Sequence, residues 1–249
     1  MKKVLIISSG LLAIFITVFM SCSKNSTSTT TTSAATLPDV FKKFNSTLTI
    51  STDGNYVIIK SNGLPDHKSC YFAATDARYQ AYNGTNANFA INPNRIAEQS
   101  LTFKIPLNPA AASTKQATPL GPIGVSVNGV PLFNQYAGPN QPLTSEINSF
   151  DQYNGHPQQT GQYHYHVEPL YITSLQGKNG LIGFLLDGYP VYGPVENGAT
   201  LVGTNLDTYH GHTGVTADYP NGIYHYHITA DAPYINGNGF WGTPGTVTQ

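Results

Sequence analysis

The sequence predicts a mainly β domain, built as a sandwich or in a barrel-like form. Its composition favours β structure over helix: Gly 24, Pro 17 and Tyr 16 make the 249-residue chain rich in turn-forming residues and tyrosine, and only 10% of it is charged, against roughly 25% in an average soluble domain. Apolar residues alternate over short runs that end at Gly, Pro, Asn or Asp. A helical period of 3.6 residues is convincing nowhere, with a weak trace at residues 95–101.

The first 21 residues are typical of a secretory leader. Lys2 and Lys3 precede an apolar run over residues 4–20, and a small residue, Ser21, stands before Cys22. This order resembles a bacterial lipoprotein signal in which the cysteine is acylated, although a phenylalanine replaces the usual leucine at the start of the motif. An uncleaved signal anchor is the alternative, since the run just reaches spanning length. Both interpretations place the domain in the cell envelope. Lipid on Cys22 would make the membrane a partner, with the domain facing the periplasm or the outer-membrane surface.

The segment after the leader is predicted to be a tether over residues 22–36, followed by one folded domain over residues 37–249. Residues 23–36 are nearly all Ser, Thr, Ala and Asn, which cannot bury enough apolar surface to order themselves. Without the leader, ten basic and thirteen acidic residues remain, which excludes nucleic acid as a partner. Cys70 has no partner for an internal disulfide, so we expect a small buried apolar side chain, with a soft metal ligand as the alternative.

The start of the domain reads as β structure. Residues 47–50 and 56–60 alternate around Asp53-Gly54, which predicts a hairpin with a tight turn. Residues 101–105 predict a further strand, which ends at a proline.

Three blocks recur in the same order, at offsets of 59, 56 and 61 residues. Each copy begins with a strand, an Asn-Gly or Asp-Gly turn and a return strand whose proline indicates an edge or a bulge. A D-x-Y-x-G-H block and a G-x-Y-H-Y-H block follow. We therefore predict an internal duplication of a hairpin–loop–strand unit, over about residues 121–166 and 180–227, with the copies related by a pseudo-twofold axis. Symmetry would bring equivalent histidines together or build twin sites.

Six of the eight histidines fall in the repeated blocks. Because side chains alternate along a strand, the two histidines of each Y-H-Y-H share one face and the tyrosines the other. Two such imidazoles can hold one ion at 2.0–2.1 Å, and the histidine of the preceding Gly-His loop can supply a third nitrogen. The alternative is that these histidines only hydrogen-bond on a half-exposed sheet. The candidate ligands are His156, His164 and His166 in one unit and His212, His225 and His227 in the other.

Several neighbouring residues have two interpretations. Asp151 and Asp207 could hold the distal N–H of a ligating histidine, or could shape the D-x-Y-x-G-H loop as Asx-turns. The motif tyrosines are predicted to pack in the core with hydrogen-bonded hydroxyls. Glu168 could extend the first motif to a cupin-like H-x-H-x-E, but the second copy has Thr229 there. His210 has no counterpart, which makes it a weak ligand candidate.

The chain resembles the bacterial YHYH-domain family, named after the tetrapeptide at residues 163–166 and 224–227. Residues 61–67, 92–94, 155–157, 186–194 and 237–242 also resemble the family pattern, so the likeness extends over nearly the whole chain from about residue 40, with residues 68–90 as an apparent insertion. The resemblance implies an exported protein of no agreed activity. Because His67 lies in a matched segment, it becomes a further possible metal ligand.

Three functions follow from these patterns. The first is an exported lipoprotein that binds copper or zinc through the histidines. The second is a metal-dependent enzyme with a three-histidine ion and an open position, in which Asp151 or Asp207 accepts a proton. The third is a non-catalytic module that binds glycans or protein through aromatic side chains of the insertion, namely Tyr71, Phe72, Tyr79 and Tyr82. No hydrolase, phosphate-loop or dinucleotide motif occurs, and the sequence names no protein partner.

Overall fold

A computed structural model describes Met1 and residues 36–249 of the chain. The predicted leader beyond Met1, Cys22 and the tether up to residue 35 lie outside the described residues. The described residues from 36 to 249 belong to one compact unit. Within the described part of the chain, no helix combines the length and the apolar character needed to cross a membrane.

A four-stranded antiparallel sheet opens the folded unit. Its order is β1-β2-β3-β16, formed by Thr49–Asp53, Tyr56–Ser61, Leu101–Pro106 and Thr246–Thr248. The predicted hairpin and the predicted third strand are both present. Since Asp53 pairs with Tyr56, the tight turn consists of Gly54 and Asn55 rather than of Asp53-Gly54. The weak helical trace at residues 95–101 was wrong, because the chain is irregular until β3 begins at Leu101.

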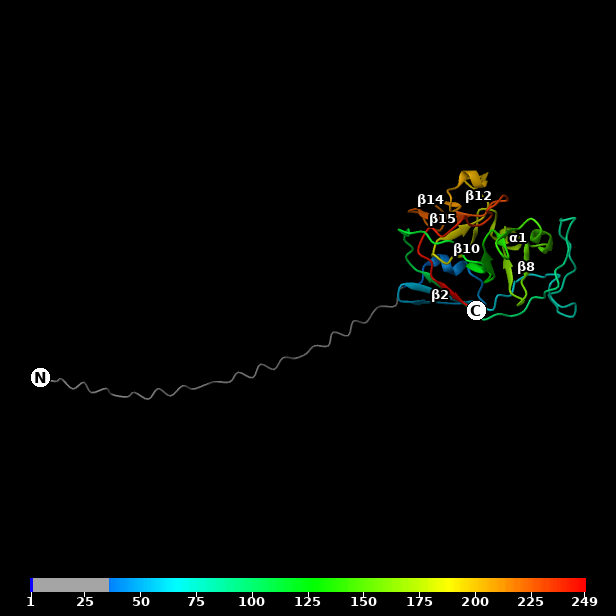
Figure 1. Cartoon of the computed structure of the whole chain (residues 1–249), viewed down its shortest axis with the longest axis horizontal. Coiled ribbons are helices and arrows are strands. Elements are labelled where there is room, and N and C mark those ends of the chain that lie inside the picture. The colour runs from blue at the N-terminus through cyan, green and yellow to red at the C-terminus, as the bar shows by residue number, and fades with distance from the viewer. Residues whose placement is uncertain (2–35) are drawn as a thin grey trace. The chain divides into compact units, whose positions relative to one another are not determined.

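An eight-stranded sheet carries the repeated blocks, in the order β14-β15-β11-β10-β4-β5-β9-β8. The first repeat unit supplies β4 (Pro122–Ser126), β5 (Pro131–Phe133), β8 (Gly155–Pro157) and β9 (Tyr163–Tyr165). The second supplies β10 (Leu181–Leu185), β11 (Pro190–Tyr192), β14 (Gly211–Gly214) and β15 (Ile223–His227). Strands β14 and β8 are therefore the two outer strands of this sheet (Figure 1).

Short elements complete the described part of the chain. Two-residue strands form the hairpins β6–β7 (Tyr136–Ala137 and Gln141–Pro142) and β12–β13 (Val195–Glu196 and Ala199–Thr200). The one α-helix of the described residues is α1 (Leu170–Gln176), and the 3-10 helices are η1 (Asp39–Lys43), η2 (Glu146–Ser149) and η3 (Gly203–Asn205).

The eight-stranded sheet is symmetric about its central pair, β4 and β10. Val125 faces Phe184 there, and each is the counterpart of the other in the repeat alignment. Outward from this pair, both halves contain a parallel contact, β5 with β9 and β11 with β15, and then an antiparallel one, β9 with β8 and β15 with β14. The two units thus lie side by side in one sheet. Their origin by duplication stays a prediction.

Equivalent glycines allow the central strands to approach each other. A Cβ on Gly124 would lie 2.4 Å from the carbonyl oxygen of Phe184, and one on Gly183 would lie 2.1 Å from that of Val125. Register shifts beside both glycines show a bulge in each hairpin, as the prolines of the return strands predicted.

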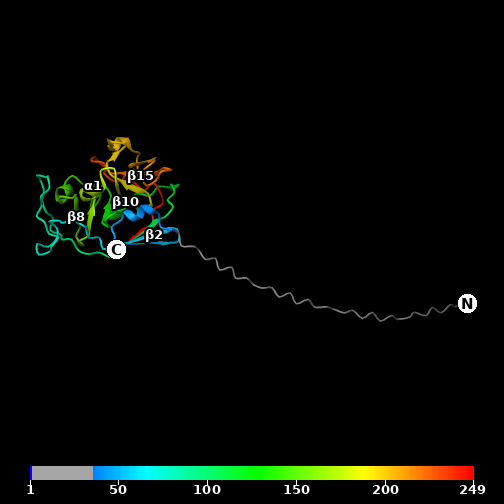
Figure 2. The same cartoon turned by 180° about the vertical axis from the view of Figure 1, so that it is seen from behind.

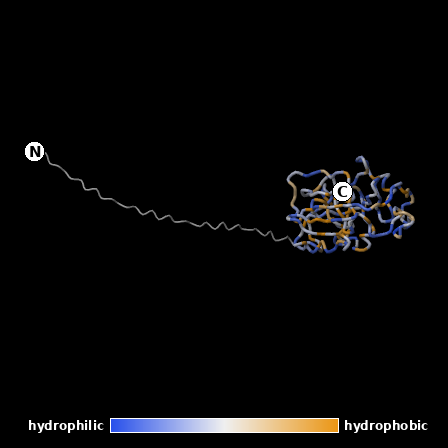
Figure 3. The backbone as a smooth tube through the Cα atoms, turned by 90° about the horizontal axis from the view of Figure 1, so that it is seen from below, coloured by the Kyte–Doolittle hydropathy of each residue, from blue (hydrophilic) through white to orange (hydrophobic). Residues whose placement is uncertain are grey.

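The two sheets share one hydrophobic core. It joins Val57, Ile59 and Phe103 of the four-stranded sheet to Val125 and Phe184 of the eight-stranded sheet. Figure 3 shows that strongly hydrophobic stretches run through the middle of the folded unit. The architecture is mainly β and sandwich-like. The barrel-like alternative was wrong, because the eight-stranded sheet stays open at β8 and β14.

The apparent insertion runs along the outer side of β8, where both views show it as a cyan loop (Figures 1 and 2). It is held by buried Tyr71, whose hydroxyl donates to the Ser149 carbonyl, and by the Ala90 amide, which donates to the Asn148 carbonyl. Two of its four candidate contact aromatics, Tyr71 and Phe72, are buried. The ring of Tyr82 stacks on Phe89 at 3.7 Å. Of the four, Tyr79 is exposed, so the expected row of exposed aromatic side chains does not form.

Candidate metal centres

Cross-strand register brings the three histidines of the first unit together. His156 lies on β8 directly opposite His164 on β9, so their side chains share one face of the sheet. His166 lies two residues beyond His164 and turns to the same side. The sequence placed His156 in a loop, whereas the structure places it in a short strand. Strand pairing, rather than loop geometry, therefore aligns the third imidazole.

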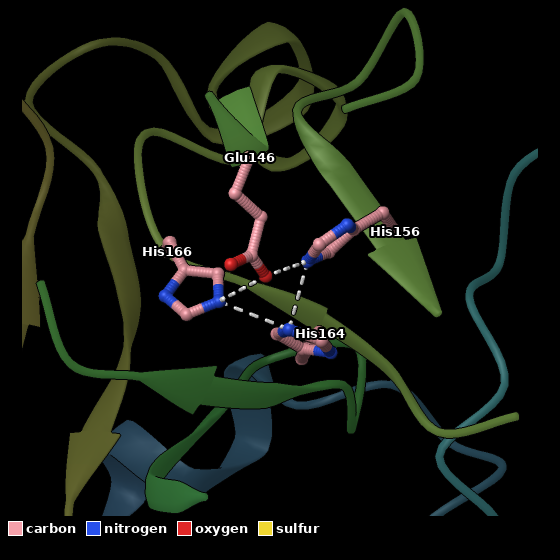
Figure 4. Close-up of side chains that lie close together, drawn as sticks. All are labelled: Glu146, His156, His164 and His166. Carbon is pink, nitrogen blue, oxygen red and sulfur yellow. Dashed lines mark hydrogen bonds and ion pairs between the residues drawn. The ribbon is translucent and has the colours of Figure 1, made fainter. Parts of the chain in front are cut away.

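Centre 1 consists of these three histidines and Glu146, from η2. The Nε2 atom of His164 lies 3.0 Å from the Nε2 of His156 and 3.0 Å from that of His166. One carboxylate oxygen of Glu146 lies 3.1 Å from the Nε2 of His156, and the four side chains converge on one point (Figure 4). Ligands at 2.0–2.1 Å from a tetrahedral ion are separated by about 3.3 Å, which is close to these three separations, and all four donor atoms lie within 4.8 Å of one another.

Backbone carbonyls determine which nitrogen of each ring carries the proton. The Nδ1 of His164 faces the Gln162 carbonyl at 3.0 Å, and that of His166 faces the Asn134 carbonyl at 2.6 Å. A carbonyl oxygen only accepts, so both Nδ1 atoms donate and each neutral ring has its lone pair on Nε2. Two lone pairs therefore face each other across 3.0 Å. This contact is repulsive unless a cation lies between the two atoms.

Two side chains contact the Nδ1 of His156, the third ring of centre 1. The Ser149 hydroxyl donates its hydrogen to the Glu146 carbonyl at 2.7 Å and lies 2.8 Å from the Nδ1 of His156. The amide nitrogen of Asn92, which only donates, lies 3.4 Å from the same Nδ1, so the neighbours of His156 do not assign its tautomer. The Nε2 of His156 faces the Glu146 carboxylate at 3.1 Å.

Centre 2 repeats the arrangement at the other outer strand of the sheet. His212 on β14 lies opposite His225 on β15, and His227 follows two residues later. Glu196, from β12, completes the group: its two oxygens lie 3.2 Å from the Nε2 of His212 and 3.3 Å from that of His225. The six histidines thus form two clusters, one in each unit, and not a single cluster shared by both units.

The same backbone positions orient the rings of centre 2. The Nδ1 of His225 faces the Ile223 carbonyl at 3.0 Å, and that of His227 faces the Gly193 carbonyl at 2.9 Å. Ile223 and Gly193 are the repeat counterparts of Gln162 and Asn134. Since the acceptors are backbone oxygens, the residue types at these positions are free to differ while the tautomer stays the same.

Burial keeps these imidazoles neutral. Desolvation, followed by repulsion from His156 and His166, lowers the pKa of His164 well below 6.5. Desolvation lowers the pKa of His166 and of His227 to about 4. It also lowers the pKa of His225. Near neutral pH a proton is therefore a poor candidate for the cation that the Nε2 atoms require.

Glu146 is ionised in this setting. Burial raises the pKa of its carboxyl group, but the hydrogen bond with His156 and the electrostatic contacts with His156 and His166 outweigh burial, so that the net shift is downward. Centre 1 therefore combines three imidazoles with one carboxylate.

Asp151 and Asp207 do not hold the histidines, which corrects one of the two interpretations of these residues. Asp151 accepts from the backbone amides of Tyr153 and Gly155 and from the Tyr163 hydroxyl. Asp207 does the same in the second loop, where its oxygen accepts from the Tyr224 hydroxyl at 3.0 Å. Both act as Asx-turn residues that shape the loop.

The motif tyrosines point away from the centres, as alternation along the strand predicted. All four are buried and bonded: Tyr163 and Tyr224 donate to Asp151 and Asp207, Tyr226 donates to Asp187, and Tyr165 contacts His67 and Asn128.

The other candidate ligands lie outside both centres. His67 bonds the Tyr165 hydroxyl through Nε2 and the Lys68 carbonyl through Nδ1, so its predicted ligand role has no cluster to join. The Nε2 of His210 bonds Thr229. Glu168 pairs with Lys178 and accepts from Thr173, which removes the cupin-like set. Cys70 is buried and belongs to neither group.

The two glutamates could not be found from the repeat, because neither has an acidic counterpart in the other unit. The counterpart of Glu196 in the first unit is Ala137. Offsets of 56 to 59 residues place Glu146 opposite residues 202–205, none of which is acidic. The two carboxylates therefore reach equivalent points from different elements, η2 and β12. The only sequence signal was their rarity in a chain with 10% charged residues.

One protein-family model, with the description YHYH protein, matches residues 102–201 and 196–239. The residues of both centres lie within this match. This chain belongs to the YHYH family. The match contains all six motif histidines and both glutamates, but begins after the segment of residues 61–67, so the wider likeness expected from about residue 40 is not part of it. None of the curated proteins and none of the solved structures compared with the chain matches it.

Proposed function

We propose that this YHYH-family protein binds transition-metal ions at two separate centres, each formed by three imidazoles and one carboxylate. The approach of two unprotonated Nε2 atoms, those of His164 and His166, to 3.0 Å carries the proposal. The backbone prevents these rings from turning to relieve the contact, because each Nδ1–H of His164 and His166 is held by a carbonyl. An arrangement that is unfavourable when empty and becomes favourable around a cation is what a preformed metal site requires.

The donor set favours zinc or copper. Both metals bind neutral imidazole, and zinc also takes a carboxylate oxygen at the same distances in a four-coordinate site. Calcium and magnesium prefer sets of oxygen ligands, which neither centre offers. Relative affinity favours copper over zinc for nitrogen-rich sites, while metal supply decides which one is bound in the cell.

Metal analysis of the purified chain tests the proposal. We expect two zinc or copper ions per chain in the wild type, one in H164A/H166A, one in H225A/H227A and none in the variant with all four changes. His67→Gln is the matched control, because it removes a buried histidine outside both centres and should leave the metal content unchanged. Folding of each variant is checked by near-ultraviolet circular dichroism. Equal metal content in the wild type and the fourfold variant would overturn the proposal.

A metal-dependent enzyme is the second candidate, favoured by a cavity of about 280 Å³ that reaches His225, His227 and Glu196. The proton-acceptor role considered for Asp151 and Asp207 has no support in the structure, since their oxygens are occupied by tyrosine hydroxyls and loop amides. A search for hydrolytic or oxidative turnover by the metal-loaded protein distinguishes this candidate from a binding protein.

We also propose that the protein works in the cell envelope, anchored by lipid on Cys22. The support is the order of the N-terminal residues alone: two lysines, an apolar run, Ser21 and then cysteine. Mass spectrometry of the protein purified from membranes tests this directly. The expected mature chain begins at an acylated Cys22, whereas a chain that retains residues 1–21 would support the signal anchor instead.

A further inference from the structure

The two centres share their donor atoms but not their surroundings. In centre 1, the Phe133 ring stacks on His164 with centroids 3.9 Å apart, and the Phe150 ring lies parallel to His166 at 5.8 Å. The three imidazole side chains are at most 4% exposed; of the four ligands, only Glu146 has substantial exposure, 28% of its side chain. Two phenylalanines thus cover this centre.

Different residues occupy the covering positions at centre 2. The counterpart of Phe133 is Tyr192, whose ring lies 5.5 Å from His225 and 6.3 Å from His227. Its hydroxyl bonds Asp218 and Thr216, which holds the ring away from a stacking position. The residue before the loop aspartate is Leu206 instead of Phe150, and 33% of the His212 side chain is exposed. Centre 2 is therefore uncovered.

A cavity of about 280 Å³ occupies the uncovered side, and His225, His227 and Glu196 form part of its wall. The Nε2 atom of His227 is buried, yet has no hydrogen-bond partner among the described residues. His227 is only 2% exposed, so its unpaired nitrogen is a buried polar atom at the edge of a cavity. The volume is close to the lower end of the ~300–1,000 Å³ range of ligand pockets, which suits a small molecule.

The charge of the site selects the kind of molecule. A divalent ion held by three neutral imidazoles and one carboxylate keeps one net positive charge. The nearest further carboxylate of the cavity wall, Asp218, is already paired with Lys43 at 2.5 Å. The side-chain amides of Gln176 and Asn179 add hydrogen-bond donors to the wall. An anion is favoured there, and a cation is not.

We propose that centre 2 is the exchangeable centre, which binds a small anion such as a carboxylate through its metal ion, whereas centre 1 is closed and structural. This inference rests on the proposed function, since both centres must hold a metal. The anion adds as a fifth ligand from the cavity, a coordination change that zinc and copper both accept. No covalent bond within the protein forms or breaks.

Azide binding to the copper-loaded protein tests the difference between the centres. H164A/H166A retains only centre 2 and H225A/H227A only centre 1, and each is loaded with one Cu(II). Azide should produce a saturable azide-to-copper absorption band at centre 2, with an affinity at least about tenfold higher than at centre 1. Equal affinities, or a band at centre 1 alone, would overturn the inference. Failure of both variants to bind either copper or zinc would instead overturn the proposed function.

A variant of the cavity wall tests the inference without altering a ligand. Ala217→Trp adds a large side chain to the cavity that adjoins centre 2, and Ala87→Trp is the matched control at an exposed alanine in the insertion. In the otherwise unchanged chain, we expect copper content to stay at two ions in both variants. Azide affinity should fall at least about tenfold in the first and stay unchanged in the second. Unchanged azide affinity in Ala217→Trp would contradict anion entry through this cavity. A separate competition of acetate with azide checks that a carboxylate binds at the same point.

Discussion

At the level of single residues, the position of one proton decides what each histidine can do. Backbone carbonyls hold the Nδ1–H of His164, His166, His225 and His227, so all four rings present an unprotonated Nε2. A metal-binding histidine commonly donates its other ring N–H to a carboxylate, a backbone carbonyl or water, and these four histidines use backbone carbonyls. The aspartates of the repeated loops are thereby left to organise the loops.

The two glutamates provide a test at this scale. Glu146→Gln should weaken metal binding at centre 1 by more than about 100-fold, and Glu196→Gln should do the same at centre 2. Each change removes the only anion among four donors. For comparison, loss of a group that only orients a ligand costs about 10–100-fold in metal affinity. Competition with a chromophoric chelator, in variants that retain a single centre, measures the affinity. Glu168→Gln is the control, since Glu168 follows His166 closely in sequence but pairs with Lys178.

A similar loss in Glu168→Gln, or no loss in Glu146→Gln and Glu196→Gln, would show that the carboxylates are not ligands.

At the level of elements, the short strands β8 and β14 are the parts that create the centres. Each pairs antiparallel with the Y-H-Y-H strand in a register that puts histidine opposite histidine, His156 with His164 and His212 with His225. A shift of one residue would turn β8 over and point His156 to the opposite face. The Tyr163 ring helps to hold the register, because it packs directly on Gly155. A Cβ added to Gly155 would lie 2.3 Å from this ring.

The central strands provide a test at the level of elements. Gly124→Ala and Gly183→Ala should each lower the free energy of unfolding by about 3 kcal/mol, because the added methyl group meets a backbone carbonyl that cannot move away. This value is the upper end of the ~1–3 kcal/mol cost of overpacking a core. Urea denaturation measures the change. Gly138→Ala is the control, because a Cβ there has no atom within 4 Å.

If the Gly138 variant lost as much stability as the other two, the close approach of β4 and β10 would not be the reason for the glycines.

At the level of the whole molecule, proton binding and folding are coupled, and the proposed metal binding would be coupled to both. The pKa of His166 and of His227 is about 4 in the folded protein and 6.5 in the reference state. Between these values the unfolded chain binds more protons, so the metal-free protein loses stability as pH falls from about 6.5 to about 4. Each of these two histidines accounts for about 3 kcal/mol of this loss, at 1.36 kcal/mol per pKa unit.

Metal ions should make this dependence steeper, because protons compete for every ligand nitrogen. With Zn(II) or Cu(II) at about 100 times the dissociation constant, each occupied centre stabilises the folded state by about 2.7 kcal/mol. Thermal unfolding at about pH 7.5 should show a metal-induced rise in midpoint, smaller when one centre is removed and absent from the fourfold alanine variant. Near pH 4.5, below the reference histidine pKa of about 6.5, the rise should vanish.

An unchanged midpoint at both pH values would support the alternative in which the histidines only hydrogen-bond within the sheet.

The pattern of the sequence was sufficient for the grouping of the histidines and the class of fold. Alternation within Y-H-Y-H placed His164 and His166 on one face and the tyrosines on the other, because side-chain direction in a strand has a period of two. Repetition of the blocks correctly grouped three histidines per unit. Both features are local, so they could be deduced without knowledge of the tertiary structure.

Only the tertiary structure decided where the two units lie, which carboxylates join them and which centre is open. Glu146 and Glu196 come from elements that do not correspond in the repeat, and they reach their centres through chain paths that no periodicity records. His67 shared a recognisable segment with the family but packs against Tyr165, because a motif specifies neighbours along the chain and not across the core. Centre 1 is covered because Phe133 stacks on His164, whereas centre 2 is open because the hydroxyl of Tyr192 bonds Asp218. Residues distant in sequence make these contacts, which form only in the folded molecule.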